Sequence, residues 1–298
     1  MRPPAISLGA GDVALLASDI HAGDHDPRLL DLLGSEIERA IDDEPGISSG
    51  TLWLFLLGDV FEAWIGDDDD DATALAALAW LERLRRRSSR PLRALVMRGN
   101  RDFLLGAPLP DRAPGFVARA GMSVFDDPIL LDAFGVRTVL CHGDSLCTDD
   151  TDYQAFRRLV RSPDWQQAFL ARPLVERREL ARAMRAQSRA AMANSRDADA
   201  GSIGDVDPKA VREVLLDSGA RRLIHGHTHR PACHRIQIDG RACERWVLPD
   251  WDADGLRGGL LRIGTDGIRR LGPWPSDAPD ECRDDLRQAP AASRPPSD

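Results

Sequence analysis

The chain has 298 residues, of which 43% are hydrophobic and 29% charged, the balance of a globular protein with one substantial core. Its net charge of −9 disfavours nucleic acid as a partner, since binding a phosphate backbone needs a basic face. No apolar run reaches the ~18–20 residues that span a bilayer, and the N-terminus lacks the apolar segment of a signal peptide, so we expect a cytoplasmic protein.

Five short apolar runs, predicted to be strands, each end in polar residues of the kinds that bind metals. The runs lie at residues 13–17, 52–57, 92–97, 137–141 and 221–224. The polar segments that follow them are Ser18-Asp19-Ile20-His21, Gly58-Asp59, Gly99-Asn100-Arg101-Asp102, His142-Gly143-Asp144 and His225-Gly226-His227-Thr228-His229. Helical patterns at 28–41 and 73–87 alternate with the first strands, which predicts an α/β sheet. Because ligands of such sheets gather beyond the carboxyl ends of the strands, we expect the polar segments to meet.

The segment 151–200 has a different character. It is rich in Ala, Leu and Arg, and between residues 151 and 196 ten Arg stand against four acidic residues. It is predicted to form two or three helices inserted between the fourth and fifth strands. Residues 208–218 are expected to form another helix and 247–263 closing strands. From residue 272 on, Pro, Asp, Ser and Ala dominate, so we expect one domain over 1–271 and a disordered tail over 272–298.

Seven candidate metal ligands follow the predicted strands: Asp19, His21, Asp59, Asn100, His142, His227 and His229. Carboxylate, imidazole and amide oxygen together suit Mn²⁺, Fe²⁺ or Zn²⁺ better than Ca²⁺. Two ions ~3.5–4 Å apart that share a carboxylate account for so many ligands. Taken singly, each motif has an ordinary explanation as a helix cap or turn, but the joint occurrence favours a metal centre. The five cysteines include no CxxC pair and are expected to be free thiols.

The order of these motifs resembles the calcineurin-like metallophosphoesterase superfamily over roughly residues 13–265. The resemblance implies a two-sheet β-sandwich flanked by helices, with a dinuclear centre at one edge. It also implies the grouping of the ligands. One ion would be held by Asp19, His21, Asp59 and His229, and the other by Asp59, Asn100, His142 and His227. Asp59 would then bridge two ions, for which Mn²⁺ is the expected metal.

Four longer blocks, residues 58–68, 99–106, 142–150 and 225–231, are similar to signatures of the UDP-2,3-diacylglucosamine hydrolase family of the lipid A pathway. This resemblance implies hydrolysis of the pyrophosphate bond of UDP-2,3-diacylglucosamine, giving UMP and 2,3-diacylglucosamine 1-phosphate (lipid X). It implies catalytic roles for Asn100, Arg101 and His227. The implied substrate contacts are Asn100, Arg101, Asp150, Ser188, Asn194, Arg196 and His227. The family also uses an Asn and a Lys after the serine. The segment 192–196 aligns ambiguously with that part of the family, and Asn194 and Arg196 are the residues that could take these two places.

Arg101 stands where many members of the superfamily have His. A guanidinium stays charged and can hold two phosphate oxygens at once, but it is no ordinary general acid. This suits a phosphate leaving group, which needs little protonation.

The insertion is expected to be an acyl-chain cap that brings the protein to the cytoplasmic face of the inner membrane as a peripheral protein. Its apolar side chains would line a groove: Phe156, Leu159, Val160, Phe169, Leu170, Leu174, Val175, Leu180 and Met184. Arg157, Arg177, Arg182 and Arg189 would surround it. The alternative is a helical hairpin packed on the core with a solvated Arg face. Two other functions stay open: another metallophosphoesterase that acts on a nucleotide or phosphoprotein, and a non-catalytic relative that binds a partner.

Overall fold

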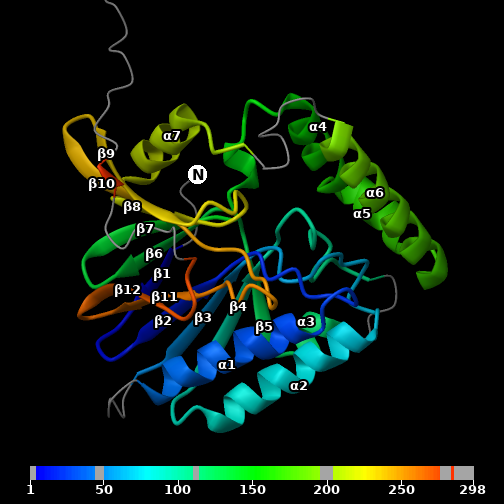
Figure 1. Cartoon of the computed structure of the whole chain (residues 1–298), viewed down its shortest axis with the longest axis horizontal. Helices are drawn as coiled ribbons and strands as arrows, with labels where there is room; N and C mark the ends of the chain where they lie inside the picture. The colour runs from blue at the N-terminus through cyan, green and yellow to red at the C-terminus, as the bar shows by residue number, and fades with distance from the viewer. Residues whose placement is uncertain (1–4, 44–49, 110–113, 195–203, 276–282, 285–298) are drawn as a thin grey trace, which may run out of the picture.

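The computed structural model of the chain contains two β-sheets that pack face to face between layers of helices (Figure 1). It describes residues 5–43, 50–109, 114–194, 204–275 and 283–284, with backbone only for residues 188–194 and 283–284. Within these ranges, the strands of one sheet run in the order β12 (Gly267–Leu271), β11 (Leu260–Gly264), β2 (Val13–Ala17), β3 (Leu52–Leu57), β4 (Leu92–Met97) and β5 (Met122–Phe125). Those of the other run β1 (Ala5–Leu8), β6 (Ile129–Ala133), β7 (Val136–Leu140), β8 (Arg222–His225), β10 (Arg241–Val247), β9 (Ala232–Ile238) and β13 (Arg283–Asp284).

The central strands β2, β3 and β4 are parallel and almost wholly apolar, because both of their faces are covered. In β2, Val13 and Leu15 pack in the core beneath helices α1 (Arg28–Asp42) and α2 (Ala72–Arg87), whereas Leu16 faces the other sheet. The short helix α3 (Phe116–Arg119) adds Phe116 to the first of these cores. Helix α7 (Pro208–Ser218) covers the outer face of the second sheet (Figure 1).

The insertion consists of α4 (Thr151–Val160), α5 (Pro163–Leu170) and α6 (Leu174–Asn194), preceded by the 3-10 turn η1 (Asp144–Leu146). In Figure 1 these helices stand at one side of the molecule, away from α1, α2 and α7. Their contact with the rest of the protein is apolar in part, since Val160, Phe169 and Leu170 are buried in the same core as β2 and α1. Of the predicted insertion, residues 195–200 lie outside the described residues.

The predicted fold class is confirmed: the structure is an α/β sandwich of two sheets flanked by helices. The runs predicted at 13–17, 52–57 and 92–97 coincide with β2, β3 and β4. The prediction of closing strands over 247–263 was largely wrong, because β10 ends at Val247 and β11 begins only at Leu260. The loop between them buries Leu248 and Trp251, and buried apolar residues in a short segment do not distinguish loop from strand.

Part of the segment predicted to be a disordered tail contacts the sheets. Trp274 Nε1 lies 3.2 Å from Leu260 O, and Arg283–Asp284 pairs in parallel with β9. The remaining residues of the predicted tail, 276–282 and 285–298, lie outside the described residues.

Free thiols are found at Cys141, Cys147 and Cys243, but Cys233 is disulfide-bonded, so the prediction of free thiols throughout was wrong. An odd number of cysteines leaves one thiol over and does not exclude a bond between others.

Candidate metal centre

The predicted ligands lie at one edge of the sandwich, where the strands of both sheets end. β2, β3 and β4 are parallel neighbours in one sheet, and β7 and β8 are parallel neighbours in the other. The two sheets are joined at this edge, because His227 N donates to Asp19 Oδ2 at 2.8 Å and His142 Nδ1 lies 2.9 Å from Leu57 O. Parallel strands that end together therefore gather segments far apart in the sequence.

Five of the seven predicted ligands have left-handed backbone conformations. The φ angles are 56° at Asp19, 54° at His21, 52° at Asp59, 66° at His227 and 54° at His229. Residues with a Cβ seldom adopt such angles, and strain of this kind concentrates at functional sites. The fold thus holds these residues in costly conformations that turn their side chains toward a shared space.

Two positions in the motifs require glycine because a carboxylate lies too close to leave room for a side chain. A Cβ on Gly99 would lie 2.0 Å from Asp59 Oδ1, and a Cβ on Gly226 would lie 2.1 Å from Asp19 Oδ2. Any side chain at either position would displace a carboxylate of the centre. The Gly-Asn and Gly-His pairs of the sequence therefore have a steric origin.

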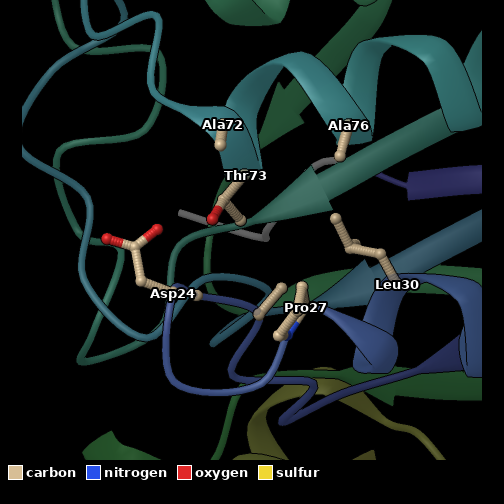
Figure 2. Close-up of a pocket in the computed structure, with 8 residues that line it drawn as sticks. Asp24, Pro27, Leu30, Ala72, Thr73 and Ala76 are labelled. Atoms are coloured by element: carbon tan, nitrogen blue, oxygen red, sulfur yellow. The ribbon is translucent and has the colours of Figure 1, made fainter.

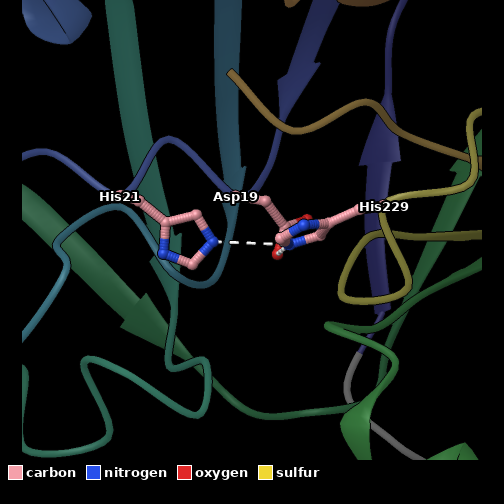
Figure 3. A group of neighbouring side chains, drawn as sticks. All are labelled: Asp19, His21 and His229. Carbon is pink, nitrogen blue, oxygen red and sulfur yellow. Dashed lines mark hydrogen bonds and ion pairs between the residues drawn. The ribbon is translucent and has the colours of Figure 1, made fainter. Parts of the chain in front are cut away.

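Asp19, His21 and His229 form what we call the open half of the centre (Figure 3). The two imidazole nitrogens His21 Nε2 and His229 Nε2 face each other at 3.4 Å, and His229 Nε2 lies 3.5 Å from Asp19 Oδ1. Asp19 Oδ1 is buried and accepts no hydrogen bond from the described residues. Burial lowers the pKa of His21, which favours the neutral imidazole, the form that ligates a metal.

Asn100, His142 and His227 form the sealed half. Asn100 Oδ1 lies 2.9 Å from His142 Nε2 and 3.0 Å from His227 Nδ1. Burial opposes a charge on His142, yet the carboxylates of Asp59 and Asp19 outweigh burial and raise the pKa of His142 to about 9. The negative potential that holds a proton on this ring also attracts a metal cation.

Asp59 lies between the two halves. Its Oδ2 is 4.0 Å from His21 Nε2 in the open half, and its Oδ1 is 3.7 Å from His142 Nε2 in the sealed half. The structure thus brings the seven predicted ligands together and gives Asp59 the position that a shared carboxylate needs. Their assignment to particular ions stays a prediction.

Three carboxylates that sequence analysis did not select support the ligands from behind. Asp102 accepts hydrogen bonds from Gly99 N (2.7 Å) and Val60 N (2.8 Å), which ties together the loops after β3 and β4. Burial and the nearby Asp59 raise the pKa of Asp102 to about 6. In the open half, Glu62 Oε2 lies 3.2 Å from His21 Nδ1 and Asp250 Oδ2 lies 3.6 Å from His229 Nδ1. Neither of these two contacts is a hydrogen bond, so Glu62 and Asp250 act on the histidines through their negative charge, which favours a cation at the centre.

Two of these three carboxylates carried a signal in the sequence, and the third did not. Asp102 and Glu62 each follow a ligand motif by two or three residues, so proximity to the motif was an available signal. Asp250 carried none, because it belongs to the loop that had been predicted as strand.

Helix α4 is attached to the sealed half through a buried carboxylate. Asp144 accepts hydrogen bonds from Tyr153 Oη (2.7 Å), Arg157 Nε (2.8 Å) and Arg161 Nη2 (3.3 Å). Arg161 Nη2 also donates to Gly99 O at 3.0 Å, next to Asn100. Burial opposes the charge of Asp144, but His142 and the two guanidinium groups keep its pKa below the ordinary range.

The expected acyl groove needs correction at several positions. Arg177 is buried, and its guanidinium pairs with Asp68 at 2.8 Å and donates to Ile65 O at 2.7 Å. Arg157 likewise neutralises Asp144, so neither cation is free to meet an anionic ligand. Val160, Phe169 and Leu170 are core residues rather than a groove lining. Long side chains of the insertion are engaged by acids of the core because buried charge requires a partner.

The predicted substrate contacts are only partly placed. Arg101 N donates to Asp59 Oδ1 at 2.7 Å, and Arg101 Nε is buried without a partner among the described residues. Asp150 is exposed and caps α4 by accepting from Tyr153 N at 2.9 Å. Ser188 and Asn194 lie in α6, where side chains are not described, and Arg196 lies outside the described residues.

A cavity of about 270 Å³ lies beside the loop after β2 (Figure 2). It is lined by Ala22, Gly23, Asp24, Pro27, Leu30, Ala72, Thr73 and Ala76. Asp24 and Thr73 are the polar side chains of this lining, and none of the predicted ligands takes part. The cavity is thus separate from the cluster of candidate metal ligands.

Known proteins match most of the chain. Residues 14–231 match the family described as Calcineurin-like phosphoesterase. The chain is 46% identical over 254 residues to the UDP-2,3-diacylglucosamine hydrolase of Chromobacterium violaceum, a match that covers 85% of this chain and 96% of that protein. It is 41% identical to the protein of the same name from Bordetella pertussis, over 85% of this chain and 92% of that protein. Among solved structures, Vacuolar Protein Sorting 29 from Cryptosporidium parvum matches with 12% identity and a TM-score of 0.38, over 88% of this chain and 86% of that one.

Proposed function

Since the chain belongs to the calcineurin-like phosphoesterase family, we propose that it hydrolyses the pyrophosphate bond of UDP-2,3-diacylglucosamine. The products are UMP and 2,3-diacylglucosamine 1-phosphate, an intermediate of lipid A synthesis. The substrate is inferred from two relatives that are both named UDP-2,3-diacylglucosamine hydrolase and that align along 92–96% of their own length. The observation that carries the proposal is the convergence of the seven predicted ligands beside Arg101 at one edge of the sandwich.

The donor set fits two divalent ions, which we take to be Mn²⁺. Asp19 has a buried carboxylate oxygen that accepts no hydrogen bond from the described residues, and the imidazole nitrogens of His21 and His229 face each other. A cation would stabilise both arrangements. Asp19, His21, Asp59 and His229 would hold one ion, and Asp59, Asn100, His142 and His227 the other. When bound, such ions stabilise the charge that develops on the phosphate and on its attacking water.

The side chains of the centre would position the substrate. The backbone N of Arg101 is bonded to Asp59, so the residue lies beside the centre, and its guanidinium would bind the oxygens of the phosphate under attack. Because a guanidinium keeps its proton, no acid group is assigned to the leaving phosphate, whose own low basicity suffices. Asn100 and His227 complete the contacts closest to the reacting phosphorus, and the remaining contacts would come from Asp150, Ser188, Asn194 and Arg196.

An assay of the purified protein with Mn²⁺ tests the function. UDP-2,3-diacylglucosamine should yield UMP and the diacylated sugar 1-phosphate, whereas p-nitrophenyl phosphate should be a poor substrate. Rapid turnover of the monoester with none of the lipid nucleotide would favour a different phosphoesterase. Inactivity on both, with metal bound, would favour a non-catalytic relative.

The proposed enzyme works as a peripheral protein at the cytoplasmic face of the inner membrane. No helix among the described residues is long and apolar enough to cross a membrane. The insertion supports surface attachment, because Phe156 and Leu159 on α4 and Val175 and Leu180 on α6 are exposed. Exposed apolar side chains can enter the headgroup region, and nearby cations add ~1 kcal/mol each on an anionic surface.

Sedimentation with phosphatidylglycerol vesicles tests this attachment. The wild type should bind at low salt and be released as salt shortens the screening length. Replacement of Phe156 and Leu159 with Ser should weaken binding, whereas Leu75→Ser, an equally exposed leucine on α2, should not. Equal binding by all three proteins would contradict attachment through the insertion.

A further inference from the structure

The backbone of Glu62 is held in register with that of His21. His21 N donates to Asp59 O, Ala22 N to Val60 O, and Glu62 N to Ala22 O, each at 2.9 Å. These three bonds form a short parallel ladder between the loops after β2 and β3. Glu62 therefore has a fixed position relative to a candidate metal ligand, although the two are 41 positions apart in the sequence.

The carboxylate of Glu62 has one oxygen on the open half and the other on the insertion. Glu62 Oε2 lies 3.2 Å from His21 Nδ1, and Glu62 Oε1 forms an ion pair with Arg185 of α6. All three side chains are largely shielded from water, with 15–28% of each exposed, so these interactions are less screened than a surface pair. His21 Nδ1 forms no hydrogen bond with the described residues, so Glu62 acts on the ring through its negative charge, which makes the imidazole a stronger ligand for a cation.

The second histidine of the open half provides the contrast. Asp250 Oδ2 lies 3.6 Å from His229 Nδ1 and is paired with Arg257. Arg257, however, belongs to the loop between β10 and β11 of the same domain core. Within the described part of the chain, the carboxylate beside His21 thus forms an ion pair with the insertion, whereas the carboxylate beside His229 forms its ion pair within the core.

We propose that Glu62 is a positioning residue that couples the seating of helix α6 on the domain to the metal ligand His21. The inference rests on the proposed function only in taking His21 as a ligand. Coupling of this kind is reciprocal: an ion on His21 stabilises the docked α6, and the docked α6 tightens that ion. Ser188, a predicted substrate contact, lies one helical turn beyond Arg185, so the position of α6 also bears on where the substrate binds.

Calorimetric Mn²⁺ titration combined with hydrogen exchange of α6 tests the coupling. Glu62→Ala should weaken one of two ions by ~10–100-fold and leave the other unchanged. Glu62→Gln removes the charge but keeps the size of the side chain, so its loss should match that of Glu62→Ala. In the wild type Mn²⁺ should slow exchange in α6, and Arg185→Gln should abolish this slowing while both ions still bind. Glu176→Gln, which removes an exposed glutamate of α6, should match the wild type.

Three results would overturn the proposal: unchanged Mn²⁺ affinity in Glu62→Ala, equal weakening of both ions, or no effect of Mn²⁺ on exchange in wild-type α6. If Glu62→Ala does not fold, the Mn²⁺ affinity of Glu62→Gln decides instead. Failure of the wild type to hydrolyse UDP-2,3-diacylglucosamine would refute the proposed function alone, because the metal titration and the exchange measurement need no substrate.

Discussion

The two halves of the candidate centre differ in how they are enclosed. In the sealed half, His142 is fully buried and His227 is 5% exposed, and a backbone carbonyl of β3 contacts the ring of His142. In the open half, the side chains of His21 and His229 are 15% and 31% exposed and have carboxylates behind them. The sealed half is thus held by strand backbone and by α4, whereas the open half depends on side chains from loops and from α6.

Removal of the group that joins the halves should have the largest effect. Asp59→Ala is expected to abolish hydrolysis and to release both ions, because each half loses a ligand. Mass spectrometry of the metal content checks this directly. Asp31→Ala, an exposed aspartate of α1, serves as the control. Two ions retained per chain in Asp59→Ala would refute the shared position.

Weakening of the open half should affect one ion. Asp250→Asn is expected to lower the Mn²⁺ affinity of the ion on His229 by ~10–100-fold, since it removes a negative charge 3.6 Å from His229 Nδ1. Calorimetric titration gives both affinities. Asp254→Asn, in the same loop and exposed, should leave both as they are. A similar fall for both ions in Asp250→Asn would mean that the halves are not independent.

Loss of a contact that supports the sealed half should change the metal affinity less than it changes the free energy of unfolding. Arg161→Met removes donors to Asp144 and to Gly99 O. Hydrogen bonds to charged groups contribute roughly 1.5–3 kcal/mol, so the free energy of unfolding should fall by about this amount. Urea denaturation measures it, with the exposed neighbour Arg158→Met as the control. A loss no greater than that of the control would show that α4 does not brace this half.

The parts of the molecule that were predictable from sequence are those governed by local pattern. β2, β3 and β4 are parallel strands with both faces covered, so their apolar runs have clear ends. The ligands lie immediately after those ends. The convergence of Asp19 with His227 followed from the general rule that such ends meet.

What was missed depends on contacts between distant segments. The partners of Arg157 and Arg177 are acids of the core, and nothing in the helical pattern of the insertion distinguishes these arginines from exposed Arg182. Asp250 reaches His229 from a loop whose buried apolar residues imitate a strand. A long side chain takes its partner from the assembled fold, so sequence spacing alone does not identify it.

Anomalous diffraction from crystals grown with Mn²⁺ tests the central claim most directly. Two peaks ~3.5–4 Å apart are expected, one beside Asp19, His21 and His229 and the other beside Asn100, His142 and His227. Asp59 should lie within bonding distance of both. A single peak, or two peaks with a different grouping of the histidines, would contradict the account.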